Sequence, residues 1–229
     1  KYLLGFVVSG KAGQRIDCYC DGSFSSWSDY AQAGWQNGTS DGTISDMACG
    51  DNIVVVGSYN SRDSWGSLDG GIYGYQGAFS GNDVTSFTSF GTLIDGRNLP
   101  HVCAPGAAVV SSSSSYYASA ANLQPNALQA KYVESGRTNI WHQSLGTSMA
   151  TPVVAGAIAL WLEADPTLTI DDVKDIIATT AQVDADVLGT KGNPLQWGAG
   201  KFDAYAGLKE VIRRASTGLE SVPERLNRL

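Results

Sequence analysis

The segment from Ser148 to Ala164 constrains the fold most, because small or apolar residues occupy nearly every side of the helix that it would form. A helix without a polar face has to be buried, and its alanines and glycines let neighbouring elements approach closely. Pro152 falls near the first turn of this helix, where a missing N–H group is tolerated. The segment therefore predicts a core helix that needs neighbours on all sides.

Two further stretches indicate how a domain is built around this helix. Ile53 to Val56 is a continuous β-branched run that ends at Gly57, which is typical of a strand buried on both faces. Thr169 to Asp172 resemble a capping box at the start of a surface helix, with aspartate in the usual glutamate position. Together these patterns predict a buried strand and a surface helix in addition to the core helix.

Other parts of the chain lack helical periodicity. Residues 1–40 carry short apolar runs separated by glycine and serine, which favours a β-rich segment. The stretch from Ser111 to Gln143 is predicted to be an irregular connection, either a functional rim or a flexible insertion. From about Ala215 the sequence turns polar, which predicts a linker or tail over residues 215–229.

Composition and charge exclude several classes of protein. The chain has 22 acidic and 15 basic residues and a net charge of -7, so it lacks the basic footprint of a nucleic-acid-binding protein. No apolar run reaches the ~18 residues that suggest a transmembrane helix, so we expect no membrane span. The N-terminal residues do not resemble a signal peptide and include no initiator methionine, so we expect the chain to begin inside a longer polypeptide.

The four cysteines, Cys18, Cys20, Cys49 and Cys103, show no spacing typical of a metal site. Free cysteines are among the most buried residues, so small buried side chains are the simplest interpretation. A disulfide that joins Cys49 or Cys103 to another cysteine is the alternative. The cysteines therefore do not decide between an oxidising and a reducing compartment for this protein.

Ser148 is the candidate for chemistry. It lies in the sequence GTSMATP, between a strand-like segment (Thr138 to His142) and the predicted core helix. A serine at a strand-to-helix turn is well placed to be a nucleophile, and the free N–H groups of a helix N-terminus can stabilise a developing oxyanion. Taken alone, the same pattern also fits a serine that only caps a helix.

At these residues the sequence resembles a known family. GTSMATP followed by VVAGAIAL is similar to the nucleophile motif of the subtilases, the subtilisin-like serine endopeptidases. Further segments agree with the pattern of this family in the same order along the chain: residues 52–57, Phe87 to Gly91, Asp95-Gly96-Arg97, Ala104-Pro105-Gly106, Asp172 to Ala181 and Trp197 to Gly200. The resemblance spans about Asp41 to Gly207 and leaves the first forty residues uncovered.

The resemblance implies a subtilisin-like three-layer α/β/α fold with a mostly parallel sheet, of which this chain holds the C-terminal part. Residues 41–214 would be this part of the catalytic domain, and residues 1–40 would be the end of an inserted domain. The implied activity is hydrolysis of peptide bonds in polypeptide substrates, by an enzyme that is extracellular, on the cell surface or periplasmic. Calcium is common in the family, but no aspartate cluster here has the spacing of a calcium loop, so no metal or other cofactor is assigned.

Departures from the family pattern matter as much. Triads of this family run Asp, His, Ser along the chain, and Ser148 needs a histidine within about 3 Å. The only histidines are His101 and His142, and neither stands in a segment like the family's His-Gly-Thr. The usual oxyanion asparagine is also missing. We therefore expect the Asp and the His to lie upstream of this chain, with Ser148 as nucleophile and as one backbone oxyanion donor, and the chain alone to be inactive.

Other schemes find less support. An α/β-hydrolase needs a histidine after its nucleophile, and none follows Ser148. The main alternative is a catalytically inactive subtilase homologue that binds peptides or proteins. In either case the helix from Ser148 to Ala164 should keep an apolar face uncovered within this chain. We expect that face to associate with the N-terminal part of the same protein or with a second copy.

Overall fold

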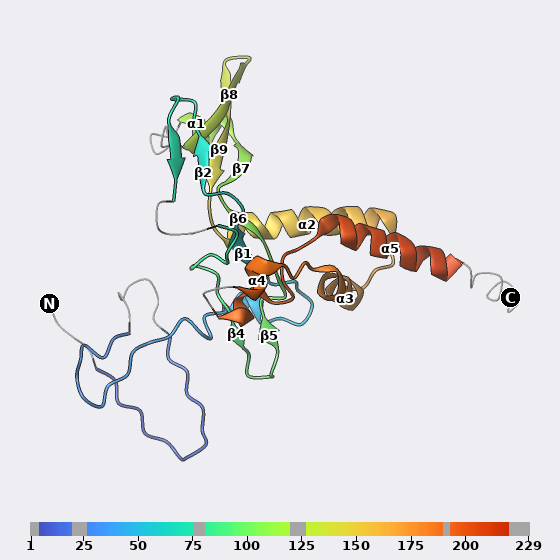
Figure 1. Cartoon of the computed structure of the whole chain (residues 1–229). Helices are drawn as coiled ribbons and strands as arrows, with labels where there is room; N and C mark the ends of the chain where they lie inside the picture. The colour runs from blue at the N-terminus through green and yellow to red at the C-terminus, as the bar shows by residue number, and fades with distance from the viewer. Residues whose placement is uncertain (1–4, 20–26, 76–80, 120–126, 190–192, 220–229) are drawn as a thin grey trace, which may run out of the picture. The chain divides into compact units, whose positions relative to one another are not determined.

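The structure is a computed structural model that describes residues 5–19, 27–75, 81–119, 127–189 and 193–219. The chain divides into two compact units, Lys1–Ser40 and Asp41–Leu229. All helices and strands of the described residues belong to the second unit (Figure 1).

Two parallel strands form the centre of the larger unit. β1 (Val56–Asn60) pairs in parallel with β6 (Val102–Ala107), and both are buried over most of their length. The strand predicted over Ile53 to Val56 is confirmed only at Val56, where β1 begins, because Ile53 to Val55 lie outside the strand and are only partly buried. Just before β1, the N–H group of Val55 donates to Nδ1 of His101 at 2.9 Å, and the carbonyl of Val55 accepts from the backbone N–H of His101 at 2.9 Å.

A third segment, residues 200–202, also forms backbone hydrogen bonds with β6. The N–H of Cys103 donates to the carbonyl of Gly200 at 2.9 Å, and the N–H of Phe202 donates to the carbonyl of Cys103 at 2.8 Å. Antiparallel sheets lie elsewhere in the same unit. The fold is therefore α/β with parallel and antiparallel sheets, which confirms the predicted class.

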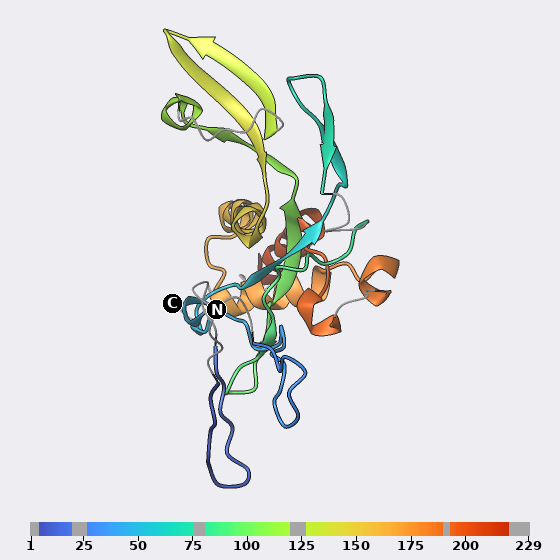
Figure 2. The ribbon, with the colours of Figure 1, turned by 90° about the vertical axis from the view of Figure 1, so that its left-hand side faces the viewer.

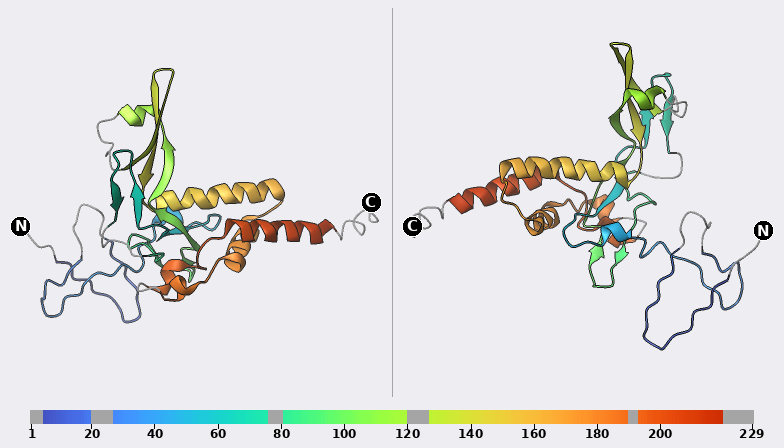
Figure 3. Two further views of the ribbon diagram at one scale, coloured as in Figure 1. Left: turned by 45° about the horizontal axis from the view of Figure 1, so that its top comes forward. Right: turned by 180° about the vertical axis from the view of Figure 1, so that it is seen from behind.

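The predicted core helix is α2 (Thr147–Ala164), which packs on β1, β6 and the C-terminal helix α5 (Ala204–Leu219) (Figures 1 and 3). Pro152 is the sixth residue of the helix, one turn further in than predicted. Its ring removes the N–H that would otherwise bond to the carbonyl of Ser148. The helix therefore tolerates this proline in its second turn.

One face of α2 is buried and the other is not. The buried residues are Ala150, Val154, Ala157 and Trp161. The exposed apolar residues include Val153, Leu160 and Leu162, of which Leu160 is 58% exposed. These exposed side chains agree with the expectation that α2 keeps an apolar face uncovered within this chain. By length and composition alone α2 could cross a membrane, which is weak evidence because core helices share these properties.

The remaining helices cover the C-terminal part of the unit. α3 (Ile170–Thr180) begins at the predicted capping box, since Thr169 Oγ1 accepts from the N–H of Asp172 and the Asp172 carboxylate accepts from the N–H of Thr169. α4 (Ala185–Leu188) and the 3-10 helix η3 (Pro194–Trp197) follow. Helix α5 then continues to Leu219, so the linker predicted from Ala215 is wrong for residues 215–219, and residues 220–229 lie outside the described residues.

The stretch predicted as an irregular connection is largely ordered in strands. β7 (Val109–Ser113), β8 (Leu128–Glu134) and β9 (Arg137–Ser144) form an antiparallel sheet in the order β7-β9-β8 (Figure 2). The short helix α1 (Ser115–Ser119) packs on β9. Serine-rich β7 gave no periodic signal because its pairing with β9 depends on residues thirty positions away.

Two short hairpins and a 3-10 turn complete the unit. β2 (Ser64–Gly66) and β3 (Ile72–Gly74) form one hairpin, and β4 (Gly91–Thr92) and β5 (Asn98–Leu99) form another. A single 3-10 turn, η1 (Asp46–Ala48), precedes them.

The smaller unit differs from its prediction. Residues 5–19 and 27–40 contain no strand, so the β-rich interpretation fails over the part of this segment that the structure describes. Its apolar side chains are largely exposed instead of forming a sheet face, for example Val7 at 89%.

The cysteines fall into different environments. Cys103 is buried, as the sequence predicts, and desolvation raises the pKa of its thiol. Cys18 is exposed and Cys49 is partly buried, so the buried interpretation is wrong for Cys18. These three residues are free thiols, and Cys20 lies outside the described residues.

Candidate nucleophile at the start of α2

Ser148 lies in the first turn of α2, next to the carboxyl end of β6. The strand β9 ends at Ser144, and the chain turns at Gly146 before the helix begins. The N–H of Gly146 donates to the carbonyl of Gly106 in β6 at 2.8 Å, which ties the turn to the end of the central strand pair. Ligands of parallel α/β folds bind at this end of the sheet.

Glycine is required on both sides of this contact. Gly146 has a backbone φ angle of 138°, which residues other than glycine rarely adopt. A Cβ atom on Gly106 would overlap the hydroxyl of Ser58 in β1 and would lie 2.8 Å from the carbonyl oxygen of Gly146. The close approach of three backbone segments therefore sets the position of the turn that carries Ser148.

The side chain and backbone of Ser148 are both available. The residue is exposed, and among the described residues neither its hydroxyl nor its N–H group makes a hydrogen bond. The first N–H groups of a helix have no partner inside the helix and lie at the positive end of its dipole. The turn therefore presents a free hydroxyl beside a free N–H donor, as a nucleophile with an oxyanion donor requires.

His101 has a structural role. The ring atom Nδ1 of His101 accepts a hydrogen bond from the backbone N–H of Val55. The backbone N–H of His101 donates to the carbonyl of Val55 at 2.9 Å. Burial, and then the nearby charge of Lys174, lower the pKa of His101 below its ordinary value. The residue stands just before β6, whereas Gly146 contacts the other end of the same strand. His101 is therefore not placed to take a proton from Ser148.

His142 is held by a different contact. It lies in β9, and its ring stacks on Tyr117 of α1 with a centroid distance of 5.3 Å. Its Nδ1 is buried and has no hydrogen-bond partner among the described residues. No hydrogen bond joins it to Ser148, so within these residues the structure brings neither histidine to the candidate nucleophile.

The environment of His101 predicts a pH dependence of stability. Its pKa in the folded chain lies below the value of about 6.5 in an unfolded chain, so between the two values the unfolded state binds more protons. The stabilising contribution is present above about pH 6.5 and is lost as the pH falls. Urea unfolding between pH 7 and pH 5 should show this loss, and His101→Gln should make the decline shallower. Equal declines in the two proteins would contradict the assignment.

Sequence reasoning missed the supporting residues of the turn. Ser58 is fully buried, and its hydroxyl has no hydrogen-bond partner among the described residues. Gly106 was noted only as part of a family motif, but its carbonyl holds Gly146 in place. No local pattern reveals these contacts, because Ser58, Gly106 and Gly146 are far apart in the sequence.

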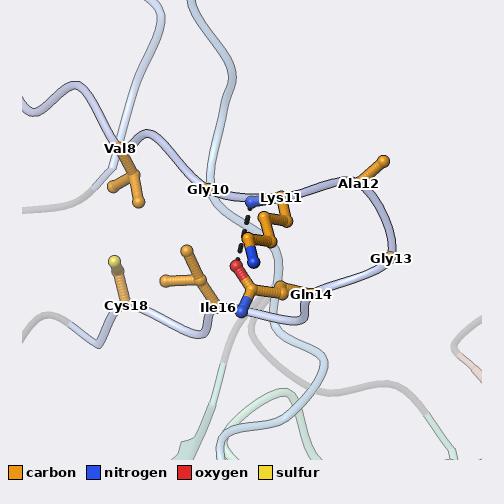
Figure 4. A pocket seen from close by; sticks show the side chains of 8 residues that line it. All are labelled: Val8, Gly10, Lys11, Ala12, Gly13, Gln14, Ile16 and Cys18. Carbon is orange, nitrogen blue, oxygen red and sulfur yellow. Dashed lines mark hydrogen bonds between the residues drawn. The ribbon is translucent and has the colours of Figure 1, made fainter.

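Other candidate sites are weaker. Among the described residues, no group of three or more His, Cys, Asp or Glu side chains could hold a metal ion. Within the smaller unit, an open pocket lies between Val8, Ile16 and Cys18, with the side chain of Gln14 accepting from the N–H of Lys11 (Figure 4). Its lining side chains are exposed and include no nucleophile paired with a base.

The structure is therefore that of an α/β protein in which an exposed serine, Ser148, lies in the first turn of α2, a helix with one buried face. The sequence pattern of the subtilase family matches residues 22–200, which is well over half of the chain. The chain therefore belongs to the subtilase family, a family of serine endopeptidases. The match begins before Asp41, so the expectation that the first forty residues lie outside the family pattern is wrong for residues 22–40.

Individual relatives are similar over parts of their length. The chain is 30% identical over 146 residues to serine protease AprX of Bacillus subtilis, covering 63% of this chain and 28% of AprX. It is 29% identical over 174 residues to subtilisin NAT of Bacillus subtilis subsp. natto, covering 72% of this chain and 36% of that protein. The chain thus spans about a third of the length of these relatives.

Solved structures give lower similarity. A protease from Pseudoalteromonas arctica matches with 21% identity and a TM-score of 0.41, over 70% of this chain and 36% of that one. Fervidolysin from Fervidobacterium pennivorans matches with 17% identity and a TM-score of 0.39, over 69% of this chain and 19% of that one.

Proposed function

We propose that this chain carries the nucleophile of a serine endopeptidase and that Ser148 is that residue. The observation that carries the proposal is the free, exposed hydroxyl of Ser148 in the first turn of α2, beside the end of β6. Membership of the subtilase family supports it. The Asp and the His of the triad are proposed to lie upstream of these residues, since neither His101 nor His142 is bonded to Ser148.

The proposed chemistry assigns two atoms of Ser148 to two tasks. Its Oγ attacks the carbonyl carbon of a peptide bond, and the hydroxyl proton passes to the histidine supplied by the upstream segment. The carbonyl oxygen then carries negative charge, which the N–H of Ser148 and the N-terminus of α2 stabilise. The tie from Gly146 to Gly106 keeps this donor fixed in the turn.

The substrate and the location of the protein follow from the same proposal. Polypeptides are the substrate class, and an extracellular, cell-surface or periplasmic location fits the family. The alternative is an inactive homologue that binds peptides or proteins. The absence of a bonded base at Ser148 among the described residues is the observation that favours this alternative.

The proposal predicts that the 229-residue chain is silent by itself, because a serine hydroxyl without its base is a weak nucleophile. The purified chain would be assayed on casein and on fluorogenic peptides. No turnover above the buffer blank is expected. Turnover that Ser148→Ala abolishes would contradict the proposed location of the partners and would assign the role of base to His101 or His142.

A further inference from the structure

The hydroxyl of Ser58 in β1 is an unusual group, because it is both buried and unpaired. Ser58 is 0% exposed, and its Oγ has no hydrogen-bond partner in the part of the chain that the structure describes. A buried hydroxyl without a partner lowers the stability of a protein, and native proteins contain few of them. Such a group therefore calls for an explanation other than stability.

The backbone of Ser58 holds this side chain in place. Its N–H donates to Oγ1 of Thr88 at 2.9 Å, and its carbonyl accepts from Oγ1 of Thr88 at 2.8 Å and from the N–H of Thr85 at 2.9 Å. Both threonines are buried as well. β1 is thus anchored through both polar backbone groups of Ser58, which leaves rotation of the side chain as the main freedom of its hydroxyl.

The side chain of Ser58 faces the end of β6 and the turn before α2, at the point where these elements meet (Figure 1). A Cβ atom on Gly106 would lie 2.3 Å from the Oγ of Ser58 and 2.8 Å from the carbonyl oxygen of Gly146. The hydroxyl and the carbonyl therefore flank one small space beside Gly106. Because glycine has no side chain, this space is left to the two oxygens.

The carbonyl of Gly146 is a suitable acceptor for this hydroxyl. It accepts from the N–H of Met149 at 2.9 Å and, over a longer distance of 3.4 Å, from the N–H of Ala150. A carbonyl oxygen has two lone pairs, and a serine hydroxyl turns toward its acceptor. The hydroxyl of Ser58 can therefore share this oxygen with the first hydrogen bond of α2.

The position of Gly146 sets that of Ser148, two residues further on. The N–H of Gly146 donates to the carbonyl of Gly106 at 2.8 Å, which fixes the turn through its donor. A bond from Ser58 to the carbonyl of Gly146 would fix the next peptide group as well, and that group leads into Ser148. Its placement matters, because an error of about 1 Å at the reacting groups can lower a rate about 100-fold.

We propose that Ser58 is a positioning residue for the nucleophile. When the upstream segment completes the site, its hydroxyl donates to the carbonyl of Gly146 and so holds Ser148 in the geometry of attack. This inference rests on the proposed function, because it takes Ser148 to be the group that reacts. Ser58 itself touches neither the substrate nor the reacting atoms. Its hydroxyl lowers the stability of the 229-residue chain and contributes to activity in the longer polypeptide.

The test compares Ser58→Ala with Ser67→Ala, which removes a hydroxyl that has a partner. The hydroxyl of Ser67 donates to the carbonyl of Leu128 in β8 at 2.9 Å and not to the turn before α2. Thermal melts are recorded on the 229-residue chain. The values of kcat and KM are measured in a longer polypeptide that includes the proposed upstream Asp and His.

Ser58→Ala is expected to raise the melting temperature or leave it unchanged, because it removes a buried polar group that has no partner among the described residues. In the longer polypeptide it should lower kcat about tenfold, the effect of one hydrogen bond, and leave KM within a factor of about two. Labelling by diisopropyl fluorophosphate should slow by the same factor, because this reagent makes no peptide contacts. Ser67→Ala should instead lower the melting temperature and leave kcat unchanged.

Three results would overturn the proposal. Unchanged kcat in Ser58→Ala would show that the hydroxyl does not act on the nucleophile, and a higher KM with unchanged kcat would indicate a contact with substrate. A melting temperature lowered as much as in Ser67→Ala would indicate an ordinary structural contact. The proposed function fails by a different result, a longer polypeptide without substitutions that has no turnover and an unreactive Ser148, and that result would overturn both.

Discussion

Replacing Ser148 with alanine in a longer polypeptide that includes the proposed upstream Asp and His is expected to lower kcat by about 10⁶-fold, the loss found on removing the nucleophile of subtilisin, a member of this family. The fold should be unaffected, because the change deletes one exposed hydroxyl that makes no hydrogen bond among the described residues. A peptidase assay together with a thermal melt measures both effects.

Ser216→Ala is a suitable control for this variant. Ser216 also lies on a helix, and its hydroxyl donates to the carbonyl of Ile212 in α5, away from the turn before α2. Its replacement should leave kcat within a factor of about two, since surface substitutions of this kind change stability little. A Ser148→Ala protein that retains most of its peptidase activity would exclude Ser148 as the nucleophile.

The second large effect is expected at Trp161, the largest fully buried side chain of α2. Trp161 is 0% exposed, its indole N–H donates to the carbonyl of Ala204 at 3.1 Å, and its ring packs against Phe202. The ring also fills the space beside Gly207, where a Cβ atom would overlap it. Trp161→Ala should therefore lower the free energy of unfolding by about 3–5 kcal/mol, as expected for deletion of a large core side chain.

A matched control is Trp141→Ala in β9. Trp141 is 39% exposed, so the same deletion removes a partly solvated ring and leaves no enclosed cavity. We expect a loss below about 1.5 kcal/mol in urea unfolding. Equal losses for the two tryptophans would show that the contact between α2 and α5 is not part of the cooperative core.

Local sequence patterns predicted those elements that are stabilised by contacts between neighbouring residues. The hydrogen bonds of the capping box join Thr169 and Asp172, which are only three residues apart, and α3 begins where they predict it. The apolar composition of α2 likewise predicted a helix at Thr147–Ala164. Its exposed residues, such as Leu160, could not be identified from the sequence, because which side is covered depends on where β6 and α5 lie.

Patterns failed where pairing partners are distant. β7 has a polar sequence and is a strand because β9 aligns with it, with Val109 opposite Ser144. Just before β1, the side chain of His101 accepts a hydrogen bond from the N–H of Val55, 46 residues earlier in the chain. Neither contact can be inferred from a window of neighbouring residues.

The candidate site was predicted in part. The sequence around Ser148 placed the residue at a strand-to-helix turn, and the structure has that turn after β9. The contacts that fix the turn, from Gly146 to Gly106 and from Gly106 to Ser58, were not predicted, because they join three separate segments. Ser148 as nucleophile stays a prediction until its reactivity is measured.

Covalent labelling of Ser148 tests this assignment most directly. A longer polypeptide that includes the proposed upstream Asp and His would be treated with diisopropyl fluorophosphate, which reacts with activated serines, and its peptides would be sequenced by mass spectrometry. The proposal predicts one stoichiometric adduct on Ser148, lost together with peptidase activity in Ser148→Ala. An active protein whose adduct lies on another residue, or whose Ser148 stays unmodified, would contradict it.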